Sequence, residues 1–404
     1  MSINEYSKTK IASQEIDQET TAYWGGVLAM TLCVFVLVAS EFMPVSLLTP
    51  MAMTFKVSEG LIGQGVSISG ATALIASLLI SILAGNVDRR TLLLWMTALM
   101  LMSGVMIALS PSYAIYMIGR TLIGISIGGF WALSAATAIR LVPSAQVPKA
   151  LTIFNSGNAL AMVIAAPLGS YLGNYVGWRG AFLCLIPVAL ISFIWQWICL
   201  PSMTVQQENQ PTIKGMFRVV IKPLNRFGFI AAGLFFMGQF CLFTYIRPFL
   251  EHSVDIVGSK LSLILLVMGV MGFLGTTVIG GFLRFGLYKV LCGIPLLMAL
   301  IAVALVCSAH VEIAIIILLG LWGFVATAAP VGWWAWLADA MPNDSEIGGG
   351  LMVAIVQLSV GIGSTMGGLL FDTSGYQGTF YASAITLVLS LLCSMYCSKL
   401  SAVK

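Results

Sequence analysis

Long apolar runs alternate with short polar segments from residue 24 to the end of the chain. A helix needs about 20 apolar residues to cross a bilayer, and runs of about that length fall at twelve positions. They are 24–48, 61–84, 91–110, 113–139, 150–175, 181–200, 227–250, 260–283, 288–308, 312–338, 348–371 and 379–398. Because the runs lack the period-2 alternation of a membrane barrel, the sequence predicts an all-α membrane protein with twelve transmembrane helices.

The longest polar interruption divides the predicted helices into six and six. Residues 201–226 contain prolines, a QQENQ run and four basic residues. We therefore predict an N-terminal six-helix bundle over 1–200 with a tail over 1–22, a cytoplasmic linker over 201–226 and a C-terminal six-helix bundle over 227–404. AGNVDRRTLLL after the second helix has a weak counterpart in GGFLRFGLYKV after the eighth. Two such repeats facing each other across a cavity are a transporter architecture.

The basic residues predict the orientation in the membrane. An even number of spans puts both termini on one side, and that side carries fourteen lysines and arginines against three on the other, Lys56, Arg179 and Lys260. The positive-inside rule then predicts cytoplasmic termini. With 59% hydrophobic and 8% charged residues, against about 25% charged in soluble proteins, the chain is expected to lie in a lipid bilayer.

One acid interrupts the first apolar run. Glu41 in VASEFMPVS carries a charge that costs several kcal/mol in hydrocarbon unless it has a partner, a proton or a function. Counted along the helices, Glu41 lies about 7 Å and Arg120 about 9 Å outward of their helix midpoints, so the two share a depth. We predict that they pair and that Glu41 changes its proton occupancy. A permanent structural ion pair is the alternative.

The motifs around these residues resemble those of a known family. GRTLIGISIGG at 119–129 matches the arginine-bearing fourth-helix motif of the major facilitator superfamily, and DRR at 88–90 is similar to the signature loop of that superfamily. APLGSYLGNYVGWRGAF at 166–182 resembles the fifth-helix motif of its twelve-helix drug:proton antiporters. EFMPVSLLTPMA, GGFWALSAATAIRLVP, VPKAL, FTYIRP and PVGW together resemble the subfamily of bacterial purine ribonucleoside efflux pumps.

The resemblance implies a proton-coupled exporter of purine ribonucleosides such as inosine, adenosine or guanosine, which works by alternating access in the bacterial inner membrane. It also implies that Asp88, with Arg89, forms a gate at the cytoplasmic side. Two other functions stay open: broader efflux of drugs or sugars, and a non-transporting membrane receptor. We expect protons and a small molecule as partners, no nucleic acid, and a monomer.

Polar and aromatic side chains on apolar helices are the candidates for substrate binding. A purine stacks on an aromatic ring, and an amide pairs with adenine's edge. The candidates are Trp131, Asn155, Asn158, Gln239, Tyr245, Trp333, Trp336 and Gln357. For each one, an interhelical hydrogen bond or a place in an aromatic belt is the alternative.

Arg247 and the eight cysteines are the remaining residues with chemistry that the sequence brings to notice. Arg247 either snorkels to the outer surface or forms a second partner for Glu41. The eight cysteines lie in or beside apolar runs without CxxC or metal-ligand spacing. No catalytic motif, metal site or cofactor is expected, and the predicted protein is not an enzyme.

Overall fold

The computed structural model describes residues 22–83, 87–143, 146–203, 220–341 and 344–402, and its regular structure over these ranges is helical throughout. The predicted tail over 1–22 falls outside these ranges except for its last residue, and so do residues 204–219 of the predicted linker. In chain order the elements are α2 (Trp24–Phe42), the 3-10 turn η1 (Met43–Leu47), α3 (Leu48–Phe55), α4 (Glu59–Leu83), α5 (Arg89–Ala108), α6 (Tyr113–Arg140), α7 (Val147–Cys199), α9 (Pro223–Phe243), α10 (Ile246–Ser253), α11 (Ser259–Leu283), α12 (Leu287–Cys307), α13 (Glu312–Ala340) and α14 (Ser345–Ala402).

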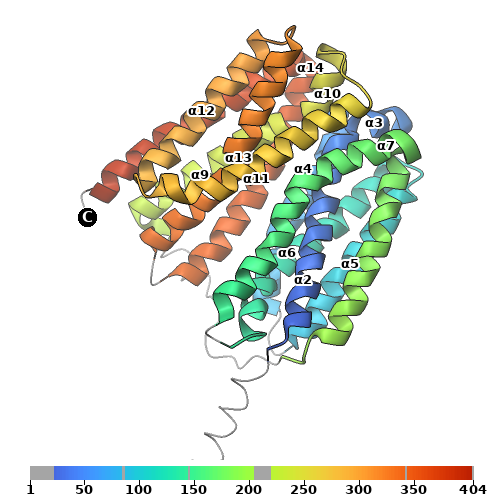
Figure 1. Cartoon of the computed structure of the whole chain (residues 1–404), viewed down its shortest axis with the longest axis vertical. Coiled ribbons are helices and arrows are strands. Elements are labelled where there is room, and N and C mark those ends of the chain that lie inside the picture. Colours follow the sequence, from blue (N-terminus) through green and yellow to red (C-terminus); the bar gives the residue numbers. More distant parts are fainter. Residues whose placement is uncertain (1–21, 84–86, 144–145, 204–219, 342–343, 403–404) are drawn as a thin grey trace, which may run out of the picture.

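Ten helical stretches of the described chain are long and apolar enough to cross a membrane. Two of them belong to α7 and α14, which have 53 and 58 residues. A straight helix of that size would measure about 80 Å, against about 30 Å for the hydrocarbon core. Each helix breaks at a glycine, Gly177 or Gly375, and Figure 1 shows α7 folding back on itself. The two breaks fall at 176–180 and 372–378, the gaps predicted between successive transmembrane helices. The total of twelve membrane crossings stays a prediction.

The helices of the two halves match in order and length. Helices α4 and α11 both have 25 residues, α5 and α12 have 20 and 21, and α6 and α13 have 28 and 29. The two glycine breaks also occupy corresponding places in the last long helix of each half. A repeated pattern of this kind is typical of transporters built from two related bundles.

The first span of each half is broken, although the sequence predicted continuous helices over 24–48 and 227–250. After Phe42 the chain passes through the five-residue turn η1 into the eight-residue helix α3. After Phe243 it turns at Thr244 and Tyr245 into the eight-residue helix α10. A proline follows each break point, at Pro44 and Pro248, and removes one backbone donor from the helical ladder.

The two ends of the bundle differ in how the halves meet. At one end, which we call the junction end, residues 41–67 lie against residues 245–252 and 357–372 through hydrogen bonds. At the opposite end, the tail end, α2 begins beside the end of α7, and Cys397 of α14 bonds to Leu224 of α9. Figure 1 shows the blue-to-green half and the yellow-to-red half spreading apart toward the tail end.

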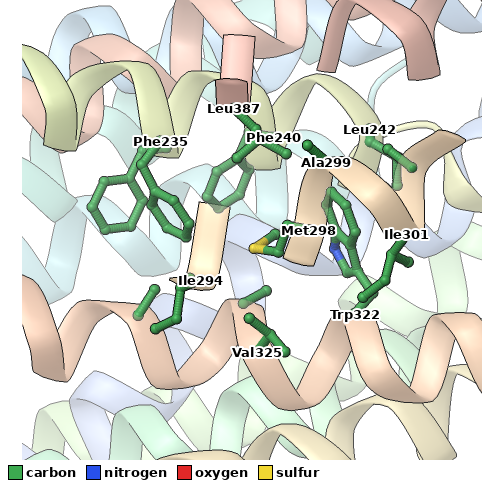
Figure 2. Packing of buried hydrophobic residues seen from close by; sticks show 14 of the residues in the cluster. Phe235, Phe240, Leu242, Ile294, Met298, Ala299, Ile301, Trp322, Val325 and Leu387 are labelled. Carbon is green, nitrogen blue, oxygen red and sulfur yellow. The ribbon is translucent and has the colours of Figure 1, made fainter. Parts of the chain in front are cut away.

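Each half has its own apolar packing. In the C-terminal half, side chains from α9, α12, α13 and α14 turn toward one another, as Figure 2 shows for Phe240, Met298, Trp322 and Leu387. These four residues are at most 4% exposed. Lipid is as apolar as such side chains, so their close packing and not their removal from water holds the helices together.

We predict that Gly375→Ala destabilises the protein. Gly375 has φ 65° and ψ −167°, a region that L-residues avoid at a cost on the order of 1–3 kcal/mol. The matched control is Gly281→Ala in α11, where an added Cβ meets no atom within 4 Å and a helical alanine is preferred by up to about 1 kcal/mol. Thermal unfolding in micelles should separate the two variants, and equal melting temperatures would contradict this prediction.

Candidate functional site

A carbonyl freed by a proline meets a buried arginine at the end of α2. Pro44 has no N–H, so it cannot donate to the carbonyl of Ser40 one helical turn earlier. Nη1 of Arg120 donates to that carbonyl at 3.1 Å, and Nη2 donates to the carbonyl of Glu41 at 3.4 Å. An unpaired carbonyl in the bilayer core costs several kcal/mol. Arg120 therefore stabilises the break in α2 at this depth.

Arg120 also fastens α6 to α4. Its side chain has 0% exposure, and its Nε donates to the carbonyl of Gly65 at 2.9 Å. Nη2 donates to Oγ of Ser69 at 2.8 Å. The guanidinium thus joins three helices of the N-terminal half through four acceptors. Its donors are directed at neutral oxygens of the main chain and of one hydroxyl.

The carboxylate of Glu41 faces the other half of the molecule. Glu41 is 4% exposed, and its Oε1 accepts a hydrogen bond from Nε2 of Gln357 on α14 at 3.5 Å. Although both side chains are described, the carboxylate of Glu41 and the guanidinium of Arg120 form no salt bridge. The expected ion pair is replaced by a contact with the main chain of Glu41, because backbone carbonyls take up the donors of Arg120. The shared depth predicted from the sequence brings the two residues together all the same.

Arg247 meets a second proline-freed carbonyl, this time across the two halves. Pro50 cannot donate to the carbonyl of Ser46, and Nη1 of Arg247 donates to it instead. Nη2 and Nε of Arg247 lie 2.7 and 2.8 Å from Oε1 of Glu251, one turn along α10. Within the described chain Arg247 therefore pairs with Glu251, and the possible second partnership with Glu41 is not formed.

Aromatic rings and an amide lie beside Glu41. The rings of Phe42 and Phe240 stack with centroids 5.6 Å apart, and Phe243 meets Phe42 edge-on at 6.2 Å. Gln239 neighbours Phe240 and Phe243 on α9. It is 6% exposed, and its Oε1 has no hydrogen-bond partner among the described residues. Phe42 follows Glu41 in the chain and Gln239 precedes Phe240, so the stacked rings join the two stretches of chain that hold the acid and the unpaired amide.

Three other candidates lie apart from this group, on α6 and α7. Asn155 is exposed and its Nδ2 donates to the carbonyl of Leu151 in its own helix. Asn158 and Trp131 are half-buried, and Trp131 meets the ring of Phe154 edge-on at 6.0 Å. Among the described residues, no hydrogen bond or ring contact joins these three to Glu41 or Gln357.

The remaining candidates are packed inside the protein. Trp333 and Trp336 are 3% and 0% exposed, and their rings meet at 6.1 Å. They belong to the apolar packing of the C-terminal half. Tyr245 has 0% exposure, and its hydroxyl donates to the carbonyl of Ser364 at 2.9 Å. In this conformation these three residues have packing roles.

The predicted gate residues lie at the tail end, at the start of α5. Asp88 is the N-cap of α5 and accepts from the N–H of Arg90 at 3.0 Å, from the N–H of Met203 at 2.8 Å and from the hydroxyl of Ser202 at 2.6 Å. Burial alone would raise the pKa of Asp88, but these hydrogen bonds and the charge of Arg90 outweigh it and lower the pKa. Asp88 thus stays ionised at neutral pH. The backbone N–H of Arg89 donates to the carbonyl of Met203 at 3.1 Å, so among the described residues both are bonded to the start of the predicted linker and not to the C-terminal half.

Sequence reasoning missed several residues that the structure brings to the contact between the halves. Phe42 and Phe240 stack across it, and Asp372 and Glu59 form hydrogen bonds across it near its outer edge. A usable signal was present at Pro44 and Pro50, since each proline frees a carbonyl that needs a donor. No comparable pattern in the sequence singles out Phe42 or Asp372.

Paired helical bundles with a polar contact between them define a membrane transport protein. The profile of the Major Facilitator Superfamily matches residues 30–346, and the chain belongs to this family. It is not an enzyme. The predicted membership of the family is therefore confirmed.

Two relatives cover nearly the whole chain. A Pseudomonas aeruginosa PAO1 protein named transcription regulatory protein OpdE is 54% identical over 374 residues, which are 92% of this chain and 93% of that protein. The purine ribonucleoside efflux pump NepI of Salmonella enteritidis PT4 is 35% identical over 369 residues, 91% of this chain and 92% of that pump.

Solved transporter structures share the fold. A mutant of the nucleoside transporter NupG aligns with a TM-score of 0.70 at 16% identity, covering 92% of this chain and 98% of that one. A bacterial homologue of the lysosomal transporter Spinster, inward-facing and unoccupied, aligns with a TM-score of 0.74 at 15% identity, covering 93% and 97%. At such identities the likeness concerns the fold alone.

We predict that Arg120 and Pro44 are energetically coupled. Arg120→Leu leaves buried carbonyls unpaired and should lower the free energy of unfolding by about 2 kcal/mol or more. Adding Pro44→Ala restores an N–H for the carbonyl of Ser40 and should recover about 1 kcal/mol. Chemical or thermal unfolding of the single and double variants measures the coupling.

Arg140→Leu is the matched control, because Arg140 is exposed at the end of the same helix. It should change the free energy of unfolding by no more than about 0.5 kcal/mol. Strictly additive effects of Pro44→Ala and Arg120→Leu would show that Arg120 does not satisfy the freed carbonyl.

Proposed function

We propose that this protein is a proton-coupled exporter of purine ribonucleosides such as inosine, adenosine or guanosine, working by alternating access. The observation that carries the proposal is the buried carboxylate of Glu41 between the halves, in contact with Gln357 and next in the chain to Phe42, whose ring stacks on Phe240 of the other half. The 35% identity to a purine ribonucleoside efflux pump over 91% of the chain supports the substrate class. Of the expected binding residues, Gln239 and Gln357 lie in this region.

The chemistry of a nucleoside fits the groups beside Glu41. A purine base offers flat faces that stack on aromatic rings such as Phe42 and Phe240, at about 1–3 kcal/mol per base. Its edge carries donors and acceptors that an amide can read, and among the described residues the buried Oε1 of Gln239 has no hydrogen-bond donor. The ribose hydroxyls would then be left for further polar groups. A purely apolar drug would leave the amides of this region unpaired, at a cost.

Glu41 supplies the coupling to protons in this proposal. When ionised, its carboxylate accepts a charge-assisted hydrogen bond from Gln357, roughly twice as strong as a neutral one. Protonation removes the charge and weakens the link between the halves, so that proton occupancy and conformation influence each other. A proton taken up from outside and released inside then drives the substrate outward. Arg120 fixes the position of Glu41 through its backbone.

The proposed exporter lies in the bacterial inner membrane and crosses it twelve times. Its tail end and both termini face the cytoplasm. The excess of basic residues on that side supports this orientation. The junction end then faces the outside, and Asp88 lies at the cytoplasmic gate. We propose a monomer that exchanges protons for a small molecule in the lipid bilayer, without a nucleic-acid partner.

We predict that expression lowers the intracellular retention of labelled inosine, adenosine or guanosine, and that Glu41→Gln abolishes this export. Glutamine keeps the shape of glutamate but cannot titrate. Phe42→Ala should weaken apparent affinity by roughly tenfold, the loss of one stacking partner. Efflux from preloaded cells at equal expression measures both effects.

Glu312→Gln is the matched control, because Glu312 is a 41% exposed acid paired with Lys260 at the surface, and it should export normally. Normal export by Glu41→Gln would remove Glu41 from the mechanism. Export of drugs or sugars in place of nucleosides would favour the broader transporter. A lack of any substrate-driven proton movement in proteoliposomes would favour a receptor or regulator, as the name of the OpdE relative suggests.

A further inference from the structure

Tyr245 of the C-terminal half inserts into the N-terminal half at the junction end. It has 0% exposure and packs in a cluster with Met43, Leu47 and Tyr116 of the N-terminal half. A Cβ on Gly63 of α4 or on Gly368 of α14 would overlap the hydroxyl of Tyr245. Both glycines are therefore needed for the ring to fit. The ring also stacks on Phe371 at 5.4 Å.

Asp372 of the C-terminal half caps a helix of the N-terminal half. The hydroxyl of Ser58 donates to Oδ2 of Asp372 at 2.6 Å, and the N–H of Gly60 donates to Oδ1 at 3.2 Å. Ser58 in turn accepts from the N–H of Leu61 at 3.2 Å, in the manner of an N-cap. The first N–H groups of α4 lack helical partners and favour a negative charge. This carboxylate therefore binds α4 from across the interface.

Other contacts at the same end also cross the interface. Nε2 of His252 lies 2.8 Å from Oε1 of Glu59, and the hydroxyl of Thr365 donates to that of Ser67 at 2.7 Å. Separation of the halves at this end would break these contacts together with those of Tyr245 and Asp372. It would also expose the ring of Tyr245 to water.

We propose that Tyr245 and Asp372 form a latch between the halves that keeps the junction end closed and must release before the transporter opens on that side. Tyr245 supplies the buried apolar part, and Asp372 supplies an exposed polar part that holds α4 in register. With the proposed orientation this is the outer side of the membrane. The latch depends on the two-bundle architecture of the family and not on the identity of the substrate.

The test measures the separation of the halves directly and needs no substrate. Met53 and Val257 are exposed positions of the two halves at the junction end. Spin labels are placed there on unnatural amino acids, so that the native cysteines stay in place. Pulsed electron paramagnetic resonance on the full chain then gives the fraction of molecules with a long distance between the two labels. We expect Tyr245→Ala to raise the ratio of open to closed molecules at least tenfold, as loss of a buried ring implies. Asp372→Ala should raise it about threefold, because its contacts are exposed.

Matched controls are Tyr381→Ala, a tyrosine of α14 that is 45% exposed, and Asp255→Asn, an exposed acid at the same end. Neither should change the ratio. A general loss of packing would lower stability without a new long distance, whereas Tyr245→Phe should keep most of the closed population. Unchanged distances in both Tyr245→Ala and Asp372→Ala would overturn the proposal. If Tyr245→Ala fails to fold, the exposed Asp372→Ala decides alone. If nucleosides are not exported, this result still stands.

Discussion

Two main-chain carbonyls without a helical donor determine how the first span is built. Pro44 and Pro50 leave the carbonyls of Ser40 and Ser46 unpaired inside an apolar bundle, and two arginines donate to them. The donor for Ser40 is Arg120, which belongs to the same half. The donor for Ser46 is Arg247, which belongs to the other half. The first bond lies within one bundle, whereas the second crosses the interface and must break if the halves part there.

The first of these bonds fixes the main chain at position 41 without pairing the carboxylate of Glu41. Arg120 takes the carbonyls of Ser40 and Glu41, so the end of α2 is fixed while the side chain of Glu41 remains free of the guanidinium. That side chain then points at Gln357 of the other half. A direct ion pair within one half would tie up the carboxylate in every conformation. In the observed arrangement it accepts instead from Gln357 of the other half, a partner that would move relative to it in the proposed transport cycle.

The sequence was sufficient for the apolar spans and the family, and it singled out Glu41 and Arg120 for the candidate site. Hydrophobic run length predicts helices reliably in a membrane, since backbone groups have no other way to be satisfied, and the gaps around Gly177 and Gly375 were correctly read as breaks. The counting of helical rise put Glu41 and Arg120 at one depth, but it could not show which atoms meet. Which atoms meet depends on the carbonyl of Ser40, which Pro44 leaves without a helical donor. Only the folded structure shows that Arg120 lies close enough to donate to it.

Burial was the property that sequence patterns predicted least well. Trp333 and Trp336 have the aromatic faces that a purine needs, yet both are enclosed by neighbouring helices. Phe42 and Phe240 are ordinary apolar residues by type and were not singled out, although they stack beside Glu41. In a membrane helix every face is apolar, so hydrophobicity does not separate residues that face lipid from those that face the partner bundle. Only the packing of the two halves makes that distinction.

The contacts between the halves change in character from the junction end toward the middle of the bundle. Near the end they are short, at 2.6 Å for Ser58 and Asp372 and 2.7 Å for Thr365 and Ser67. At Glu41 the bond to Gln357 is 3.5 Å long, close to the limit for a hydrogen bond. In the proposed mechanism, a change in charge at Glu41 would therefore act on a long hydrogen bond between the halves. The shorter contacts at the junction end would then have to break before the interface could open along its whole length.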